Sequence, residues 1–216
     1  MSGIELIRDT REPAEEANDH PDSVFRPFVF ATRKRDEPYA DRKKIVLPCS
    51  RAKLDCGDYS IRGLETKVAI ERKSGPDLLG TLFGETQTAE GERASNLDRF
   101  RRELERARGY WLFGIVVETS IAWLYAEQRA RIERYGKAFD ATSAQSILLS
   151  FGVDLACPVW WAGSKSSAEW MVGVTLSRIW DQASGGKAAK KAEARGYRLP
   201  WAGSLEASVG KRSDDG

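Results

Sequence analysis

Short apolar runs alternate with amphipathic segments along most of the chain. Leu97, Phe100, Leu104 and Ala107 recur at steps of three and four residues, which gives the single apolar stripe of an amphipathic helix. Further helices are expected at residues 76–83, 121–133, 140–151 and 166–180. Strands are expected at residues 4–9, 24–31, 45–47, 111–117 and 158–161. This alternation predicts an α/β layered domain with a mixed sheet.

Two further strands, residues 58–61 and 67–73, predict a β-hairpin. Alternate side chains of a strand share a face, so Glu71 and Lys73 are expected to point the same way. Val68 and Ile70 are then expected on the opposite face, whereas the small Ala69 lies on the face of Glu71 and Lys73. If Asp58 lies on the neighbouring strand, its carboxylate can reach Glu71. Two carboxylates and one ammonium group would then meet on one patch of sheet.

Composition limits the classes of protein that the chain can belong to. Its 216 residues are enough for one well-packed domain, and 41% hydrophobic with 31% charged residues is typical of a globular protein. No apolar run is long enough to span a membrane, and the first ten residues do not resemble a signal peptide. We expect a cytoplasmic protein without a membrane partner, associated with the nucleoid if the source is prokaryotic.

The chain holds one histidine, His20, and three irregularly spaced cysteines. This scarcity makes Ser-His-Asp, Cys-His and multi-histidine metal chemistry unexpected, and it argues against a disulfide framework. Catalysis would therefore depend on carboxylates and lysines.

Paired carboxylates with a nearby lysine suit one kind of chemistry. Two carboxylates can hold Mg²⁺, which keeps several waters and accepts phosphate oxygens. A lysine two residues along a strand can hydrogen-bond the attacking water and stabilise charge in the transition state. The alternative is an ordinary salt-bridge ladder of Asp58, Glu71 and Lys73 on a hairpin surface.

The segment Gly57-Asp58, followed by Glu71-Arg72-Lys73 and by Asp77 after three residues, resembles the GD…ERKxxxD signature of XPF-type structure-specific endonucleases. Those enzymes belong to the restriction-endonuclease-like, PD-(D/E)xK superfamily. Residues 7–12 resemble the family's DxRE element, and residues 116–118 resemble its central strand ending in an acid. The resemblance covers residues 4–180. It implies a restriction-endonuclease-like fold, with a mixed central β-sheet flanked by α-helices.

The resemblance also implies roles for individual residues. Asp58, Glu71 and Asp9 would be metal ligands, and Lys73 would orient the attacking water. Asp77 would support the site as a signature acid, or it would act only as a helix N-cap.

Two arginines of the matched motifs have open assignments. Arg72 would pair with Asp77 or Glu12, or it would contact the nucleic-acid backbone. Arg11 would contact nucleic acid, or it would form a local ion pair with Glu12.

The chain departs from the family pattern in two places. Family members often carry a tandem helix-hairpin-helix module, whereas residues 183–216 are short and polar. We expect an XPF-type nuclease domain at residues 1–182 and a basic, flexible tail at 183–216. The family's arginine and glutamine after the signature match only loosely to Arg93 and Gln87, which fall in a segment, residues 86–94, predicted to be a flexible loop.

Basic residues cluster ahead of the candidate site, although the formal net charge of the whole chain is only +2. Such clusters supply salt-sensitive affinity for phosphates. The predicted DNA-binding residues of this cluster are Arg33, Lys34, Arg35, Lys43 and Lys44. Arg99, Arg102 and Arg106 share a helix face, which would either contact phosphates or be a solvated face with internal pairs such as Arg99–Glu103 and Asp98–Arg102.

The resulting expectation is a Mg²⁺-dependent DNA endonuclease, with Mn²⁺ able to substitute. By the family resemblance its substrates would be branched or flapped DNA in repair or recombination, and it would form a homodimer or heterodimer through the nuclease domain. Two alternatives stay open. One is a catalytically silent nuclease-fold module that binds DNA or a partner, and the other is a junction resolvase or exonuclease on the same fold.

Overall fold

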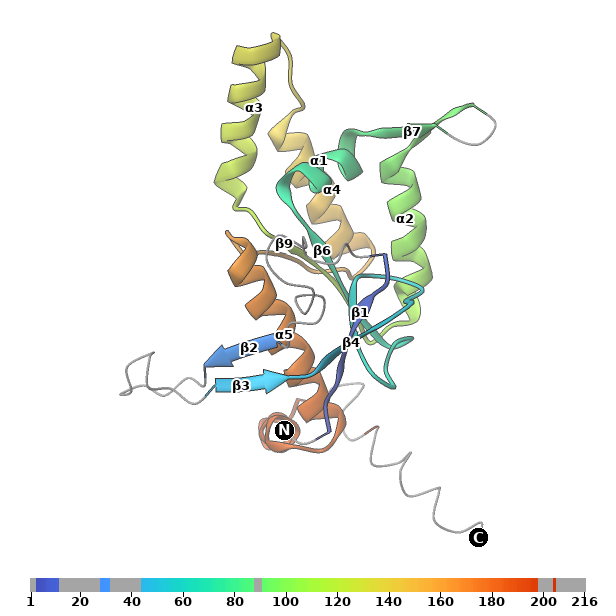
Figure 1. Ribbon diagram of the computed structural model, residues 1–216, viewed down its shortest axis with the longest axis vertical. Helices are drawn as coiled ribbons and strands as arrows, with labels where there is room; N and C mark the ends of the chain where they lie inside the picture. The colour runs from blue at the N-terminus through green and yellow to red at the C-terminus, as the bar shows by residue number, and fades with distance from the viewer. Residues whose placement is uncertain (1–2, 12–27, 32–43, 88–90, 198–203, 205–216) are drawn as a thin grey trace.

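A six-stranded mixed sheet with helices on both faces forms the body of the protein (Figure 1). The structure is a computed structural model that describes residues 3–11, 28–31, 44–87, 91–197 and 204. The sheet has the order β10-β9-β6-β5-β1-β4. Its strands are β1 (Leu6–Asp9), β4 (Cys49–Ala52), β5 (Tyr59–Ile61), β6 (Val68–Lys73), β9 (Leu112–Val117) and β10 (Val159–Trp161). The expected fold class is confirmed.

The central strand β6 is paired on both sides. It runs parallel to β9 and antiparallel to β5, as the predicted hairpin requires. The strand β5 is also antiparallel to β1, and β1 is parallel to β4. Because β6 is hydrogen-bonded to a neighbouring strand along both edges, its side chains are held at fixed positions on the two faces of the sheet.

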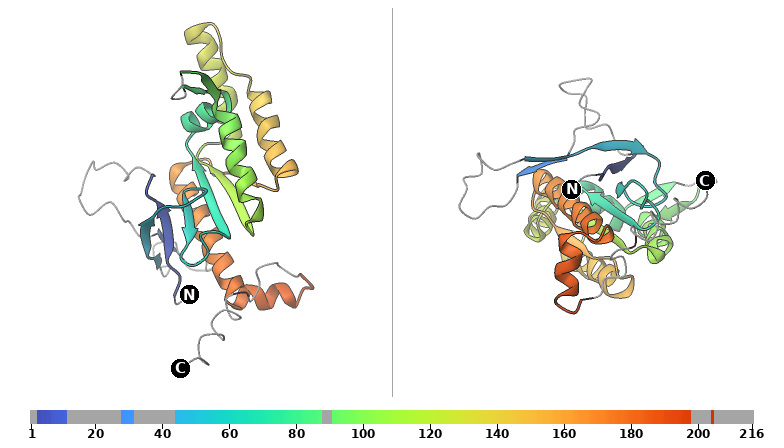
Figure 2. Two further views of the ribbon diagram at one scale, coloured as in Figure 1. Left: turned by 90° about the vertical axis from the view of Figure 1, so that its right-hand side faces the viewer. Right: turned by 90° about the horizontal axis from the view of Figure 1, so that it is seen from below.

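Helices cover both faces of this sheet (Figure 2). One face packs against α1 (Gly75–Phe83), α2 (Asn96–Arg106), the 3-10 turn η3 (Ala107–Gly109), α3 (Ile121–Tyr135) and α4 (Ala141–Asp154). The other face packs against α5 (Lys165–Ala183), which is followed by α6 (Lys187–Glu193). No helix within the described residues is long and apolar enough to cross a lipid bilayer.

The two-residue period of β6 divides the core into two apolar clusters. Val68 and Ile70 are buried with Val172 and Leu176 of α5. Ala69 is buried on the opposite face, where the α1, α2 and α4 side chains gather. Glu71 and Lys73 continue the Ala69 face, as predicted. The chemistry-bearing side chains therefore lie on the α2 side of the sheet.

Two small antiparallel ribbons lie outside the main sheet. One pairs β2 (Phe28–Ala31) with β3 (Lys44–Leu47) and lies beside α5, and the other pairs β7 (Glu85–Gln87) with β8 (Arg93–Ser95) (Figure 1). The second ribbon corrects the prediction of a loop at residues 86–94. Its strands are largely solvent-exposed and carry no apolar alternation, so the sequence pattern gave no strand signal.

Two other elements differ from the sequence-based expectation. The strand β4 was not predicted, because Cys49–Ala52 is half-buried and has no apolar repeat. Residues 187–193, within the segment expected to be a flexible tail, form α6. The Ala188 N–H donates to Asp181 Oδ2 at 2.6 Å, and Ala189 is buried. These contacts attach the start of that segment to α5.

Phe151 tests the packing on the α2 side. Its side chain is 1% exposed and meets Phe100 edge to face, with ring centroids 5.8 Å apart. Phe151→Ala should lower the free energy of unfolding by about 3–5 kcal/mol, because it opens a cavity between α2 and α4. Leu149→Ala, on the same helix but 68% exposed, should change it by less than about 0.5 kcal/mol. Denaturant titration followed by circular dichroism measures both, and equal losses would contradict this packing.

Candidate active site

The Gly57-Asp58 turn holds Asp58 between two strands of the sheet. Gly57 has φ +74°, and a Cβ there would lie 3.0 Å from Ala69 Cβ, so glycine is needed for both conformation and space. The Asp58 N–H donates to Ile70 O at 2.9 Å, and Asp58 O accepts from the Asp9 N–H at 2.8 Å. Asp58 Oδ2 accepts from the Arg72 N–H at 2.7 Å. The carboxylate is therefore fixed beside the end of β6.

Glu71 and Lys73 form a close ion pair on the α2 side of β6. Lys73 Nζ lies 2.6 Å from Glu71 Oε1 and 3.1 Å from Asp77 Oδ2. The Glu71 and Lys73 side chains are 8% and 12% exposed, whereas Asp77 is 54% exposed. The predicted shared face of Glu71 and Lys73 is confirmed.

Asp77 occupies the first turn of α1 but does not cap it. The N-cap is Ser74, whose hydroxyl accepts from the Asp77 N–H at 3.3 Å. The N-cap alternative for Asp77 is therefore wrong, because its carboxylate is directed to Lys73. Asp77 adds negative charge at the rim of the site.

The protonation of the buried pair follows from its surroundings. Burial raises the pKa of Glu71; Lys73 opposes this rise, and Glu103 adds to it. Burial would lower the pKa of Lys73, but the carboxylates of Glu71 and Asp77 outweigh that effect, so the Lys73 pKa is raised. Lys73 is therefore a cation throughout the physiological pH range.

A pocket of about 370 Å³ opens over this pair, between β6, α1 and α2. We call it the α2 pocket. It is lined by Arg11, Glu71, Lys73, Thr81, Asn96, Arg99, Phe100, Arg102, Glu103 and Arg106. Basic side chains outnumber acidic ones in this lining, so the pocket suits an anionic ligand.

Glu103 is a site residue that the sequence reasoning did not single out. Its Oε1 accepts from the Gly57 N–H at 3.0 Å, so α2 and the Gly57-Asp58 turn are joined. It lines the same pocket as Glu71. The residues joined by this hydrogen bond are 46 positions apart, and no local pattern could indicate it.

The three arginines of α2 that share a face are exposed, as a solvated face requires. Arg99, Arg102 and Arg106 also line the α2 pocket. The ion pair that α2 forms along its own surface is Arg101–Asp98, at 3.6 Å. The spacing of the three arginines indicated a common face, and only the packing of α2 shows that this face looks onto Glu71 and Lys73.

Asp9 lies at the end of β1 and is 1% exposed. Its Oδ1 accepts from Arg11 N and Nε, both at 2.7 Å, and its Oδ2 accepts from the Leu54 N–H at 2.6 Å. Arg11 also donates to Leu54 O at 3.0 Å and lines the α2 pocket. Asp9 thus holds Arg11 and the Leu54 loop in place. Glu12, the expected partner of Arg11 in a local ion pair, lies outside the described residues.

Arg72 points to the opposite face of β6. Its Nε lies 3.2 Å from Glu118 Oε1, and its guanidinium lies over the Tyr59 ring at 5.8 Å. Glu169 of α5 lies 3.9 Å away. Arg72 therefore pairs with Glu118, the residue that follows β9, and the alternative of a pair with Asp77 is wrong.

The predicted DNA-binding cluster lies mostly outside the described residues, which exclude Arg33, Lys34, Arg35 and Lys43. Lys44 is the first residue of β3, in the ribbon beside α5, on the other side of the sheet from the α2 pocket. Gln87 and Arg93 face each other across the β7–β8 ribbon and do not line the α2 pocket.

Carboxylate oxygens at the site are the candidate metal ligands. Within the described part of the chain, no three His, Cys, Asp or Glu side chains form a ready metal cluster. Mg²⁺ in nucleic-acid enzymes is held by one or two carboxylates together with water and substrate phosphates. Glu71 and Glu103 line the α2 pocket, whereas Asp58 is not among its lining residues and is held through the Arg72 N–H.

The mixed sheet, with carboxylates and a lysine at the end of its central strand, defines a nuclease-type α/β domain. The ERCC4 domain model matches residues 29–174, more than half of the chain. The chain belongs to the ERCC4 domain family, which confirms the predicted XPF-type nuclease domain.

Two solved structures are similar to the chain at 14% sequence identity and a TM-score of 0.46. One is XPF from Aeropyrum pernix, with 80% of this chain and 60% of that chain covered. The other is the same protein in complex with DNA, with 90% and 82% covered. The chain thus spans about 60% of the length of the first of these structures. A search of curated proteins gives no match.

Asp9 offers a test of how the site is supported. Burial alone would raise its pKa, but the hydrogen bonds from Arg11 and Leu54 lower the pKa below its ordinary 3.8. A carboxyl with a lowered folded-state pKa stabilises the fold above pH 3.8 and loses that contribution as pH falls through the folded-state value. Asp9→Asn should therefore cost about 2 kcal/mol of unfolding free energy at pH 7, and less below pH 3.8.

Denaturant titrations at pH 7 and in the acid range measure this difference. Asp55→Asn is the control, since Asp55 is exposed on the same loop, and it should shift stability by less than about 0.5 kcal/mol. A gap between wild type and Asp9→Asn that widens in acid would contradict the assignment.

Proposed function

We propose that this protein is a metal-dependent DNA endonuclease that hydrolyses phosphodiester bonds in branched or flapped DNA. The observation that carries the proposal is the buried Glu71–Lys73 pair at the floor of an arginine-lined pocket. A surface salt-bridge ladder would be solvent-exposed, whereas these two side chains are 8% and 12% exposed. Burying such a pair is costly, which favours a chemical use over a purely structural one.

Asp58 and Glu71 are the proposed ligands of a Mg²⁺ ion, for which Mn²⁺ can substitute. Such an ion would neutralise phosphate charge and make bound water more acidic. The raised pKa of Glu71 supports this assignment, because a nearby cation would stabilise a carboxylate that burial disfavours. Asp9 would contribute by fixing Arg11 and the turn before β5, since both of its oxygens already accept hydrogen bonds.

Lys73 is proposed to act as a cation. Its raised pKa keeps the ammonium protonated, so it donates hydrogen bonds and does not accept the proton of the attacking water. Held by Glu71 and Asp77, it is placed to orient that water and to stabilise negative charge on the phosphate in the transition state. The proton that the attacking water loses must go to solvent or to another base.

DNA would approach from the α2 side of the sheet. Arg99, Arg102 and Arg106 present three cations along one wall of the pocket. Guanidinium groups form bidentate hydrogen bonds with phosphates. Such phosphate contacts do not depend on base sequence, which suits an enzyme that selects DNA by its shape. Arg72 is committed to Glu118 on the other face and is not part of this proposed surface.

Cleavage assays test the catalytic part of the proposal. Purified protein is incubated with labelled flap, fork, four-way junction and plain duplex DNA, with Mg²⁺, with Mn²⁺ or with chelator. Lys73→Ala and Glu71→Gln should each slow cleavage at least about 100-fold, because each removes a charge aimed at the reacting phosphate. Lys67→Ala, at an exposed position in the turn just before β6, should cut like wild type.

Cutting that continues in chelator, or that survives Lys73→Ala, would contradict this mechanism. DNA that is bound by wild type and never cut with either metal would instead identify a silent binding module. Cutting confined to four-way junctions, or only from DNA ends, would identify a resolvase or an exonuclease.

The arginine wall gives a separate prediction for binding. Arg102→Ala should weaken DNA binding and reduce the slope of log affinity against log salt by about 0.9, the value for one lost phosphate contact. Arg101→Ala is the matched control, because Arg101 belongs to the same helix and pairs with Asp98 away from the pocket. Fluorescence anisotropy with chelator present measures both slopes, and equal slopes for the two variants would exclude this wall as the DNA surface.

A further inference from the structure

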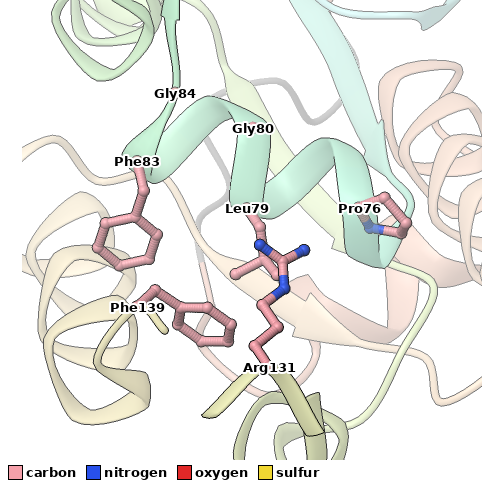
Figure 3. Close-up of a pocket in the computed structure, with 7 residues that line it drawn as sticks. All are labelled: Pro76, Leu79, Gly80, Phe83, Gly84, Arg131 and Phe139. Carbon is pink, nitrogen blue, oxygen red and sulfur yellow. The ribbon is translucent and has the colours of Figure 1, made fainter. Parts of the chain in front are cut away.

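A second pocket, of about 260 Å³, lies between α1 and α3 (Figure 3). We call it the α1–α3 pocket. It is lined by Pro76, Leu79, Gly80, Phe83, Gly84, Arg131 and Phe139. The helix α1 contributes Thr81 to the α2 pocket and a different set of side chains to this one. The two pockets therefore share one helix as their common wall.

Gly80 keeps this pocket open. It is an exposed residue inside α1, and a Cβ at its position would meet nothing within 4 Å. Gly75, the first residue of the same helix, is different, because a Cβ there would lie 2.6 Å from the Trp123 ring. Glycine is less favourable than alanine inside a helix, and at position 80 no packing contact within the chain requires it. The bare backbone at Gly80 is consistent with a ligand that approaches α1 closely.

Aromatic rings and one cation form the rest of the pocket. Phe83 and Phe139 are stacked, with centroids 5.5 Å apart and planes 27° apart, and Phe83 is 41% exposed. The Arg131 guanidinium lies 5.6 Å from the Phe139 ring centre, and Figure 3 shows it reaching from α3 toward α1. Glu127 accepts from Arg131 Nε at 2.8 Å, which fixes the guanidinium plane. None of the described lining residues is acidic.

This combination fits a flat aromatic ring that is linked to a negatively charged group. An unpaired nucleobase stacks on aromatic side chains with little dependence on sequence, and its phosphate is attracted to an arginine. A purely apolar protein segment would gain nothing from the guanidinium. The chemistry therefore favours a nucleotide over an apolar peptide as the occupant.

The position of the pocket relative to the α2 pocket supports the same occupant. Pro76 lines the α1–α3 pocket, and the next residue, Asp77, lies 3.1 Å from Lys73. Nine residues of helix span roughly 14 Å, and successive nucleotides of a strand are separated by about 3.4 Å along a duplex. A strand with its scissile phosphate at Lys73 would reach the α1–α3 pocket within a few nucleotides.

We propose that the α1–α3 pocket holds an unpaired base of the DNA and so selects branched or flapped DNA over plain duplex. The proposal rests on the proposed function, since it needs DNA at the neighbouring α2 pocket. In this proposal, α1 and α3 determine the specificity for DNA with unpaired bases, and the residues of β6 carry out cleavage.

Binding without cleavage tests it. Fluorescence anisotropy in chelator compares a duplex bearing a short unpaired arm with a plain duplex of the same length. Gly80→Leu, which fills the pocket, should weaken binding of the branched DNA about tenfold, the effect of one lost stacked base, and leave the plain duplex unchanged. Gly109→Leu is the matched control, because it makes the same change at an exposed glycine with open space around its Cβ and outside both pockets, and it should bind both DNAs like wild type.

A change in the DNA alone gives a measurement that does not depend on variant folding. Abasic residues in the unpaired arm should weaken wild-type binding by the same factor. Gly80→Leu should then cause no further loss on the abasic DNA, because both changes remove one interaction.

The outcomes separate this proposal from the proposed function. If wild type binds neither DNA, the proposed function fails, and this proposal fails with it. If wild type binds both DNAs, and Gly80→Leu or the abasic arm makes no difference, only the base pocket is overturned. If Gly80→Leu alters sedimentation of the free protein and not DNA binding, the pocket is a protein-docking surface, and the base pocket is again overturned.

Discussion

The pleat of β6 is the constraint on which the site depends. Successive side chains of this strand point to opposite faces, so Val68 and Ile70 enter the core beneath α5 while Glu71 and Lys73 point to α2. Pairing with β5 on one edge and β9 on the other prevents a shift of register. A slip of one residue would place the ion pair in the apolar core. Packing on one face therefore fixes the chemistry on the other.

The same alternation divides the Glu71-Arg72-Lys73 triplet between two sites. Arg72 lies beside Glu118 and the Tyr59 ring on the α5 face, where its charge is compensated by the end of the parallel strand β9. Lys73 lies beside Glu71 on the α2 face. Three consecutive charged residues thus include one that stabilises the sheet and two that form the floor of a pocket. We infer that Arg72 stabilises the sheet and affects the chemistry only by holding β6 in place.

The features that could be predicted from the sequence are those that short-range residue patterns determine. The hairpin, the shared face of Glu71 and Lys73, and the apolar stripe of Phe100 and Leu104 follow from periods of two and of three to four residues. The orientation of polar residues on α2 is set by how that helix packs on the sheet, so the hydrogen bond between Gly57 and Glu103 could not be predicted. The strand β4 was missed for the same reason, since only its pairing with β1 defines it.

Charge balance explains why the site needs α2. Asp58 and Glu71 carry negative charge at the proposed phosphate site, and a strand can contribute only every second side chain to one face. Lys73 alone compensates Glu71 and leaves little attraction for DNA. Arg99, Arg102 and Arg106 add three cations on the facing wall, and Arg11, oriented by Asp9, adds a fourth. The pocket can therefore hold carboxylates close to a polyanion because a helix distant in sequence supplies most of the positive charge.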